Sequence, residues 1–176
     1  MPQNSLGAGA TLVLGGARSG KSAFAEKLVL ESGLKPIYIA TSQIWDDEMR
    51  DRVDAHIARR GDDWKCVEAP LDLEGALGQA DQTGNAILVD CLTLWVTNMM
   101  MAEADISIRF SSLILQLEKL KSPVVLVTNE VGLGIVPENK MAREFRDHAG
   151  RLHQDIGAIA SEVYFIAAGL PLQMKG

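Results

Sequence analysis

Cysteine is scarce in this chain, which has only Cys66 and Cys91 among its 176 residues. Two isolated cysteines give neither the spacing of a zinc site nor the framework of a small disulfide-bonded domain. We therefore expect both to be reduced thiols, mostly buried, in a cytosolic protein.

Long apolar runs and an excess of positive charge are missing as well. No stretch approaches the roughly 18 consecutive apolar residues of a membrane span. The segment from Met1 to Ala10 lacks the basic and apolar regions of a secretion signal. A formal net charge of −6 argues against a nucleic-acid-binding surface. These absences predict a soluble, cytoplasmic protein that binds neither membranes nor nucleic acids.

The composition that remains is that of a globular enzyme, with 47% hydrophobic and 23% charged residues. A chain of this length can bury one substantial core. No repeat and no shift in composition marks a second domain. The expectation is a flexible tail over residues 1–10 and a single domain over residues 11–176.

The most informative segment is Gly-Gly-Ala-Arg-Ser-Gly-Lys-Ser at residues 15–22, directly after an apolar run. It fills the phosphate-loop pattern G-x-x-x-x-G-K-[ST] in the context of strand, turn and helix. Gly15, Gly16 and Gly20 are expected to adopt positive φ and bring N–H groups close to an anion. Lys21 can reach the β and γ phosphates, and the Ser22 hydroxyl can ligate Mg²⁺. The chain is therefore predicted to bind a nucleoside triphosphate.

Short apolar runs alternate with amphipathic segments along the rest of the chain. Strands are predicted at 11–15, 36–40, 86–90, 124–128 and 162–167, with a weaker one at 64–68. Helices are predicted at 21–32, 46–60, 92–104 and 106–121, and from Pro137 to about Ser161. This alternation predicts an α/β three-layer P-loop fold with a mostly parallel sheet.

Two acidic residues follow predicted strands. Asp90 ends an apolar strand in the form of a Walker B carboxylate, which holds Mg²⁺, although such terminal acids also cap helices. Glu130 follows the strand at 124–128, and the carboxyl ends of strands face the ligand crevice in open α/β sheets. Its carboxylate is either a general base or metal-supporting group, or a loop carboxylate bonded to backbone N–H groups.

The predicted helix at 46–60 carries Arg52, His56 and Arg60 on one face. Two flanking guanidinium groups disfavour the imidazolium, so they would keep His56 neutral and nucleophilic while attracting phosphate oxygens. Such an imidazole can attack phosphorus and form a phosphoramidate. The alternative is a structural histidine on a solvated basic face.

Four segments together resemble one family: GGARSGKS at 15–22, YIATSQ at 38–43, DDEMRDRVDAH at 46–56, and TNEVGLGIVPENKMAREFRDHAG at 128–150. This is the bifunctional adenosylcobinamide kinase / adenosylcobinamide-phosphate guanylyltransferase family of cobalamin biosynthesis. The resemblance spans roughly Thr11 to Lys175 and implies a RecA-like enzyme. Such an enzyme phosphorylates adenosylcobinamide with ATP or GTP, then transfers GMP from GTP through a guanylylated histidine, giving adenosyl-GDP-cobinamide and pyrophosphate. It also implies a homo-oligomer, commonly a trimer.

The resemblance implies roles for individual residues. The nucleotide-bearing histidine of the family matches His56, Lys21 completes the catalytic pair, and Ser22 and Asp90 hold Mg²⁺. The nucleotide contacts fall on Gly15, Gly16, Ala17, Arg18, Ser19, Gly20, Lys21, Ser22, Ala40, Thr41, Ser42, Ile57, Ala58, Arg59, Arg60, Glu68 and Asp90. Glu68 suits guanine or ribose, because a carboxylate accepts from the N1 and N2 donors of guanine. His148 is expected on the surface of the last helix.

Two positions depart from the family pattern. Gly61 replaces a proline after Arg60, although glycine can also end a helix. His153 replaces an asparagine, and it can still exchange a hydrogen bond.

Two other functions stay open at this point. One is a kinase of another small metabolite in which His56 is structural, and the other is a non-enzymatic nucleotide-binding switch. The run Met99-Met100-Met101 and the helix at 106–121 are candidates for a subunit interface, although helical methionines are more often core.

Overall fold

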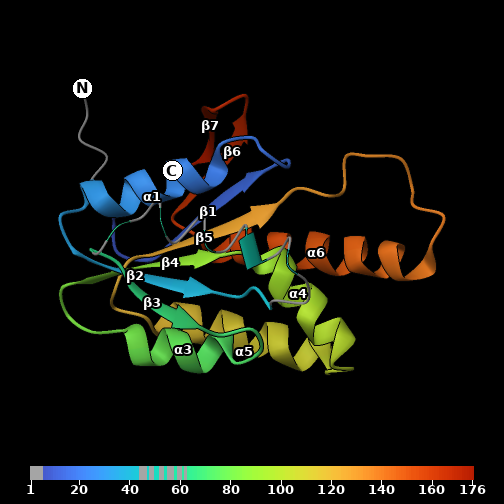
Figure 1. The fold of residues 1–176 in the computed structure, drawn as a ribbon, viewed down its shortest axis with the longest axis horizontal. Coiled ribbons are helices and arrows are strands. Elements are labelled where there is room, and N and C mark those ends of the chain that lie inside the picture. The colour runs from blue at the N-terminus through green and yellow to red at the C-terminus, as the bar shows by residue number, and fades with distance from the viewer. Residues whose placement is uncertain are drawn as a thin grey trace.

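The computed structural model describes residues 6–43, 47, 50, 51, 54, 58, 61 and 63–176. Within them, one sheet has the strand order β3-β2-β4-β5-β1-β6-β7 (Figure 1). All neighbouring strands are parallel except β6 and β7, which confirms the predicted mostly parallel sheet. The strands are β1 (Ala10–Gly15), β2 (Lys35–Ala40), β3 (Lys65–Glu68), β4 (Asn85–Asp90), β5 (Val124–Asn129), β6 (Glu162–Ala167) and β7 (Leu170–Lys175).

Helices cover both faces of this sheet, as in a three-layer fold. Helix α1 (Lys21–Glu31) lies on one face in Figure 1, and the described helices on the other face include α3 (Leu73–Ala80), α5 (Ile106–Lys119) and α6 (Lys140–Ile159). Helix α4 (Leu92–Met101) packs with the second group, since Trp95 and Met99 belong to the same apolar cluster as α3, α5 and α6.

Alternate side chains of the central strands pack into two apolar clusters, one on each face of the sheet. In β1, Leu12 and Leu14 face the cluster beneath α3, α5 and α6, whereas Val13 faces the cluster beneath α1. Successive side chains of a strand point to opposite faces, so strands buried on both sides are apolar without interruption. This is why their positions could be predicted to within one residue.

Two elements were not predicted from the sequence. Helix α3 is short and contains two glycines, and it begins where the Asp72 side chain accepts from Gly75 N–H at 3.1 Å. Strand β7 is exposed at every position, so it has no buried apolar run to reveal it.

Helix α6 begins later than predicted. The prediction placed its start at Pro137, but the first helical residue is Lys140. The Asn139 side chain accepts from Ala142 N–H at 3.2 Å, which gives this end the side-chain cap that asparagine favours.

Burial corrects two further expectations. Cys66 lies exposed on β3, which contradicts the expectation that both thiols are buried, whereas Cys91 is buried. Met99 is only 1% exposed and belongs to the core, while Met101 is 58% exposed. Met99 therefore cannot belong to a surface patch, and the candidate interface formed by all three consecutive methionines is wrong.

The predicted helix at 46–60 is described only at some positions. Asp47, Arg50, Asp51, Asp54 and Ala58 are helical and exposed. His56, Arg52 and Arg60 lie outside the described residues.

Among the residues described, the helices include none with the length and hydrophobicity needed to cross a bilayer.

Candidate nucleotide-binding site

The phosphate loop connects β1 to α1 with the expected order of elements, but its glycines serve different purposes. Gly20 precedes the helix with φ of 96°, a conformation that disfavours any side chain. Gly15 and Gly16 do not adopt positive φ, whereas Arg18 does, with φ of 56°. The expectation of positive φ at Gly15 and Gly16 is therefore wrong.

Gly15 is needed for close packing instead. A Cβ atom there would lie 2.5 Å from Ser19 Oγ and 2.7 Å from the Ile166 carbonyl oxygen. Gly15 and Ile166 are paired across β1 and β6. The absence of a side chain thus lets the start of the loop lie directly against β6.

Lys21 is buried at the start of α1, and its Nζ donates to the Gly16 carbonyl oxygen at 3.0 Å. Burial lowers the pKa of Lys21 below 10.5, and Cys91 and Asp90 partly oppose this effect. The ammonium group is therefore held against the loop itself, close to the position where a phosphate would bind.

Ser22 and Asp90 come together as a magnesium site requires. Ser22 Oγ donates to Asp90 Oδ2 at 3.1 Å, and the Tyr38 hydroxyl donates to the same oxygen at 3.0 Å. In the octahedral shell of Mg²⁺, with Mg–O distances of about 2.1 Å, adjacent ligand oxygens lie about 3 Å apart. The Ser22 and Asp90 oxygens fit this cation.

The described part of the chain contains no group of three or more His, Cys, Asp or Glu side chains able to hold a metal ion. A hydroxyl and a single carboxylate suit a Mg²⁺ that takes its other ligands from phosphates and water. The residues therefore fit a magnesium ion bound together with a nucleotide.

Three adjacent strands end in, or lead directly into, the other described residues that were predicted to contact the nucleotide. Ala40 is in register with Glu68 of β3 and with Asp90 of β4, so the three residues form one row at the carboxyl edge of the sheet. Glu68 is exposed at this edge. Thr41 and Ser42 follow Ala40 directly.

Buried hydrogen bonds fix this edge. Thr41 Oγ1 donates to the Cys91 carbonyl oxygen at 2.7 Å and accepts from Cys91 N–H at 2.9 Å. Asn98 of α4 donates through Nδ2 to the carbonyl oxygens of Thr41, at 2.7 Å, and Pro70, at 2.9 Å. One amide thus joins the chain after β2 to the chain after β3.

Sequence reasoning missed Tyr38 and Asn98. Tyr38 was hidden inside an apolar strand, and no motif includes Asn98. A signal was present in the second case, because a polar residue within an otherwise apolar helical segment needs buried partners.

The nucleophile expected from the resemblance is not described. His56, Ile57, Arg59 and Arg60 all lie outside the described residues. Ala58, from the same predicted set, is helical and exposed.

Glu130 adopts the loop arrangement that was one of its two alternatives. Its carboxylate accepts from Gly132 N–H, and its own N–H donates to the Gly15 carbonyl oxygen at 2.9 Å.

Thr128 Oγ1 and His153 Nε2 are 2.7 Å apart. Burial lowers the pKa of His153, and the Glu130 carboxylate partly opposes this. The histidine that departs from the family pattern therefore still joins α6 to the end of β5.

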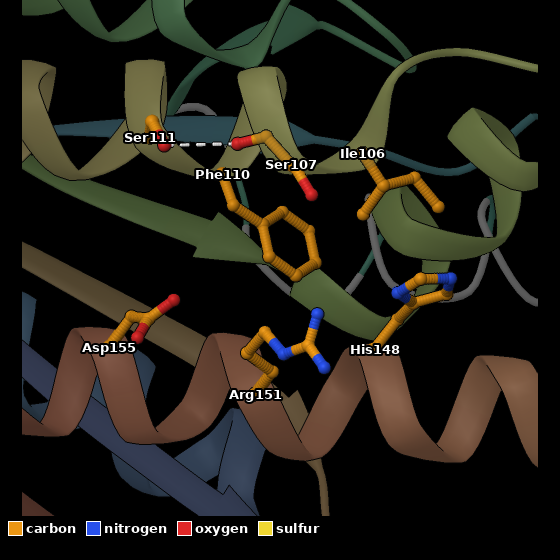
Figure 2. Close-up of a pocket in the computed structure, with 7 residues that line it drawn as sticks. All are labelled: Ile106, Ser107, Phe110, Ser111, His148, Arg151 and Asp155. Carbon is orange, nitrogen blue, oxygen red and sulfur yellow. Dashed lines mark hydrogen bonds between the residues drawn. The ribbon is translucent and has the colours of Figure 1, made fainter.

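A separate cavity of about 160 Å³ lies between α5 and α6 (Figure 2). Its lining includes Phe110, His148 and Arg151, and no residue of the phosphate loop. The ring of His148 meets Phe110 edge-on with centroids 6.4 Å apart. His148 is thus half-buried between helices, and the expectation of a plain surface position is corrected.

Comparisons with known proteins identify the family of the chain. Residues 11–174 match the family described as cobinamide kinase / cobinamide phosphate guanyltransferase. The chain is 45% identical over 167 residues to the bifunctional adenosylcobalamin biosynthesis protein CobP of Pseudomonas aeruginosa, covering 94% of this chain and 96% of that protein. It is 40% identical over 179 residues to the corresponding CobU protein of Escherichia coli, covering 93% and 98%.

Solved structures support the fold alone. The P4 protein of bacteriophage phi6, solved in complex with ADP, superposes with a TM-score of 0.52 at 14% identity. The match covers 95% of this chain and 54% of P4. The RecA-like P-loop prediction is thereby confirmed.

Proposed function

The chain belongs to the cobinamide kinase / cobinamide phosphate guanyltransferase family, and we propose that it converts adenosylcobinamide to adenosyl-GDP-cobinamide in two steps. It is a bifunctional enzyme of cobalamin biosynthesis. The first step moves a phosphoryl group from ATP or GTP to a hydroxyl of adenosylcobinamide. The second moves GMP from GTP to that phosphate and releases pyrophosphate.

The phosphate loop supports the first step. Phosphoryl transfer depends mainly on positioning and on charge stabilisation. Lys21 and the loop N–H groups bind the triphosphate, with Lys21 exchanging the Gly16 carbonyl oxygen for a phosphate oxygen. Ser22 and Asp90 would hold Mg²⁺, which neutralises phosphate charge when bound.

The second step is assigned to His56. Attack by its imidazole on the α-phosphorus forms a P–N bond and breaks the bond to pyrophosphate, and the cobinamide phosphate oxygen then displaces the histidine. A covalent intermediate divides one difficult displacement between anions into two easier ones. The row formed by Ala40, Glu68 and Asp90 offers a surface for guanosine next to Ser22, which bonds to Asp90.

The contact between Ser22 and Asp90 is the observation that supports nucleotide binding most directly. It brings the last residue of the phosphate loop against the carboxylate at the end of β4, and these are the two residues expected to hold Mg²⁺. Family membership carries the choice of substrate. We also propose a homo-oligomer, commonly a trimer in this family, formed by one domain over residues 11–176 in the cytoplasm.

The test is incubation of the protein with α-³²P-GTP and Mg²⁺, followed by denaturation and exposure of the labelled protein to acid and to alkali. We expect an acid-labile, alkali-stable label, as a phosphoramidate requires. His56→Ala should abolish this label and GMP transfer while phosphorylation of adenosylcobinamide partly remains. His148→Ala is the matched control, because this histidine contacts Phe110 rather than the loop.

Persistence of the label in His56→Ala would contradict the assigned nucleophile. Binding of GTP with neither label nor phosphorylation would instead favour a nucleotide-binding switch. Phosphorylation of a different metabolite would favour a kinase with a structural His56.

A further inference from the structure

Several carbonyl groups of the phosphate loop accept hydrogen bonds. The Gly16 oxygen accepts from Lys21 Nζ at 3.0 Å, and the Gly20 oxygen accepts from Phe24 N–H at 3.0 Å. The Gly15 oxygen accepts from Glu130 N–H at 2.9 Å. An anion-binding loop needs its N–H groups directed inward, and each carbonyl that is bonded elsewhere leaves the adjoining peptide less free to rotate.

The Ser19 carbonyl has a distant donor. Gly169 N–H donates to this oxygen at 2.8 Å, from a position 150 residues further along the chain. Gly169 belongs to the turn between β6 and β7, and β6 is the neighbour of β1 in the sheet (Figure 1). Both turn residues have positive φ, 52° at Ala168 and 76° at Gly169, as a two-residue type I′ hairpin turn requires.

The loop and the hairpin also approach each other closely. A Cβ added to Gly20 would lie 3.1 Å from the Gly169 Cα atom. Ser19 Oγ is buried and has no hydrogen-bond partner among the described residues, so its side chain does not anchor this part of the loop. In the described part of the chain, the bond from Gly169 therefore holds the Ser19–Gly20 peptide from outside the loop.

We propose that Gly169 is a positioning residue for the phosphate loop. Its N–H holds the Ser19 carbonyl outward, so that the Gly20 N–H of the same peptide stays directed toward the triphosphate. This role rests on the proposed function only in requiring that the loop bind a nucleotide. The β6–β7 hairpin is thus part of the nucleotide site, although it contributes no side chain to it.

The test removes the N–H donor of Gly169 and leaves the size of the residue almost unchanged. An amide-to-ester replacement at Gly169 deletes its N–H, and the same replacement at Gly33 is the matched control. Gly33 also has positive φ, 70°, and its N–H donates to the Leu30 carbonyl oxygen at 3.2 Å, at the far end of α1. Affinity for GTP with Mg²⁺ is measured by calorimetry.

We expect affinity to fall about fivefold for the ester at Gly169, the usual effect of one hydrogen bond, and to stay unchanged for the ester at Gly33. Gly169→Ala retains the N–H and should keep more of the affinity than the ester. Equal GTP affinity in the Gly169 ester and the unmodified protein overturns the proposal.

A second measurement needs no altered protein. Because coupling is reciprocal, GTP should slow hydrogen exchange of the Gly169 amide about fivefold and leave the Gly33 amide unaffected. Unchanged exchange at Gly169 in protein saturated with GTP overturns the proposal. The result distinguishes the role of Gly169 from the proposed function. GTP binding without GMP transfer contradicts only the proposed function. Absence of GTP binding contradicts both.

Discussion

The Asp90 carboxylate is held in place by several hydrogen bonds. Its Oδ2 atom accepts from Ser22 and from Tyr38, and Cys91, its neighbour, is joined to Thr41 by two hydrogen bonds. The position of the carboxylate is therefore set by two other segments of the chain, the start of α1 and the end of β2. A group held this firmly can ligate a metal without losing much conformational freedom on binding.

Asp90→Asn keeps the shape of this side chain but removes its charge. We expect kcat/KM of both activities to fall about 100-fold, the size of effect typical of weakened metal binding, and the Mg²⁺ requirement to rise. The measurement is activity against Mg²⁺ concentration. Asp72→Asn, which alters only the cap of α3, is the control, and equal losses in the two variants would contradict the assigned role.

The two cysteines should differ sharply in reactivity. Burial, followed by the charge of Asp90, raises the pKa of Cys91 to about 11, and the thiolate is the reactive form. Iodoacetamide at pH 8 should therefore modify exposed Cys66 in the native protein and leave Cys91 unmodified. Mass spectrometry of peptides reads the result, with unfolded protein as the control in which both react. Rapid modification of Cys91 in native protein would contradict its burial.

His153 joins helix α6 to β5 through its hydrogen bond with Thr128, and burial disfavours the protonated form of its imidazole. The pKa of His153 is lowered from 6.5 by burial, so below pH 6.5 the unfolded chain binds more protons than the folded one. The free energy of unfolding should therefore decrease as the pH falls through 6.5 toward the lower folded pKa.

His153→Asn removes this titration, so the variant should lose less stability than the original protein between pH 7 and pH 5. Glu130→Gln removes the carboxylate that supports the imidazolium and should make the loss larger. Urea unfolding at the two pH values measures both effects. Identical pH dependence in all three proteins would contradict this interpretation.

The elements also show which features a sequence can reveal. Strands such as β4 and β5 were predictable because burial on both faces leaves an apolar run. Helix α3 and strand β7 were not, since one contains two glycines and the other is exposed throughout. The phosphate loop was recognisable residue by residue, but the reason for Gly15 was not. That reason is the Ile166 carbonyl, which only the folded sheet brings near.

Across the molecule, the order of strands differs from the order in which they are synthesised. Strand β1 pairs with β5 and β6 and with neither β2, β3 nor β4. Long-range parallel pairing of this kind forms slowly, because the intervening chain must first be ordered.

This order has a consequence for a chain emerging from the ribosome. When synthesis has reached Asp90, the strand that leads into the phosphate loop still lacks both of its neighbours. The loop is among the first segments to be made, yet its native support comes from segments made last. Both edges of β1 therefore stay unpaired until β5 and β6 have been made, and unpaired strand edges of this kind favour aggregation.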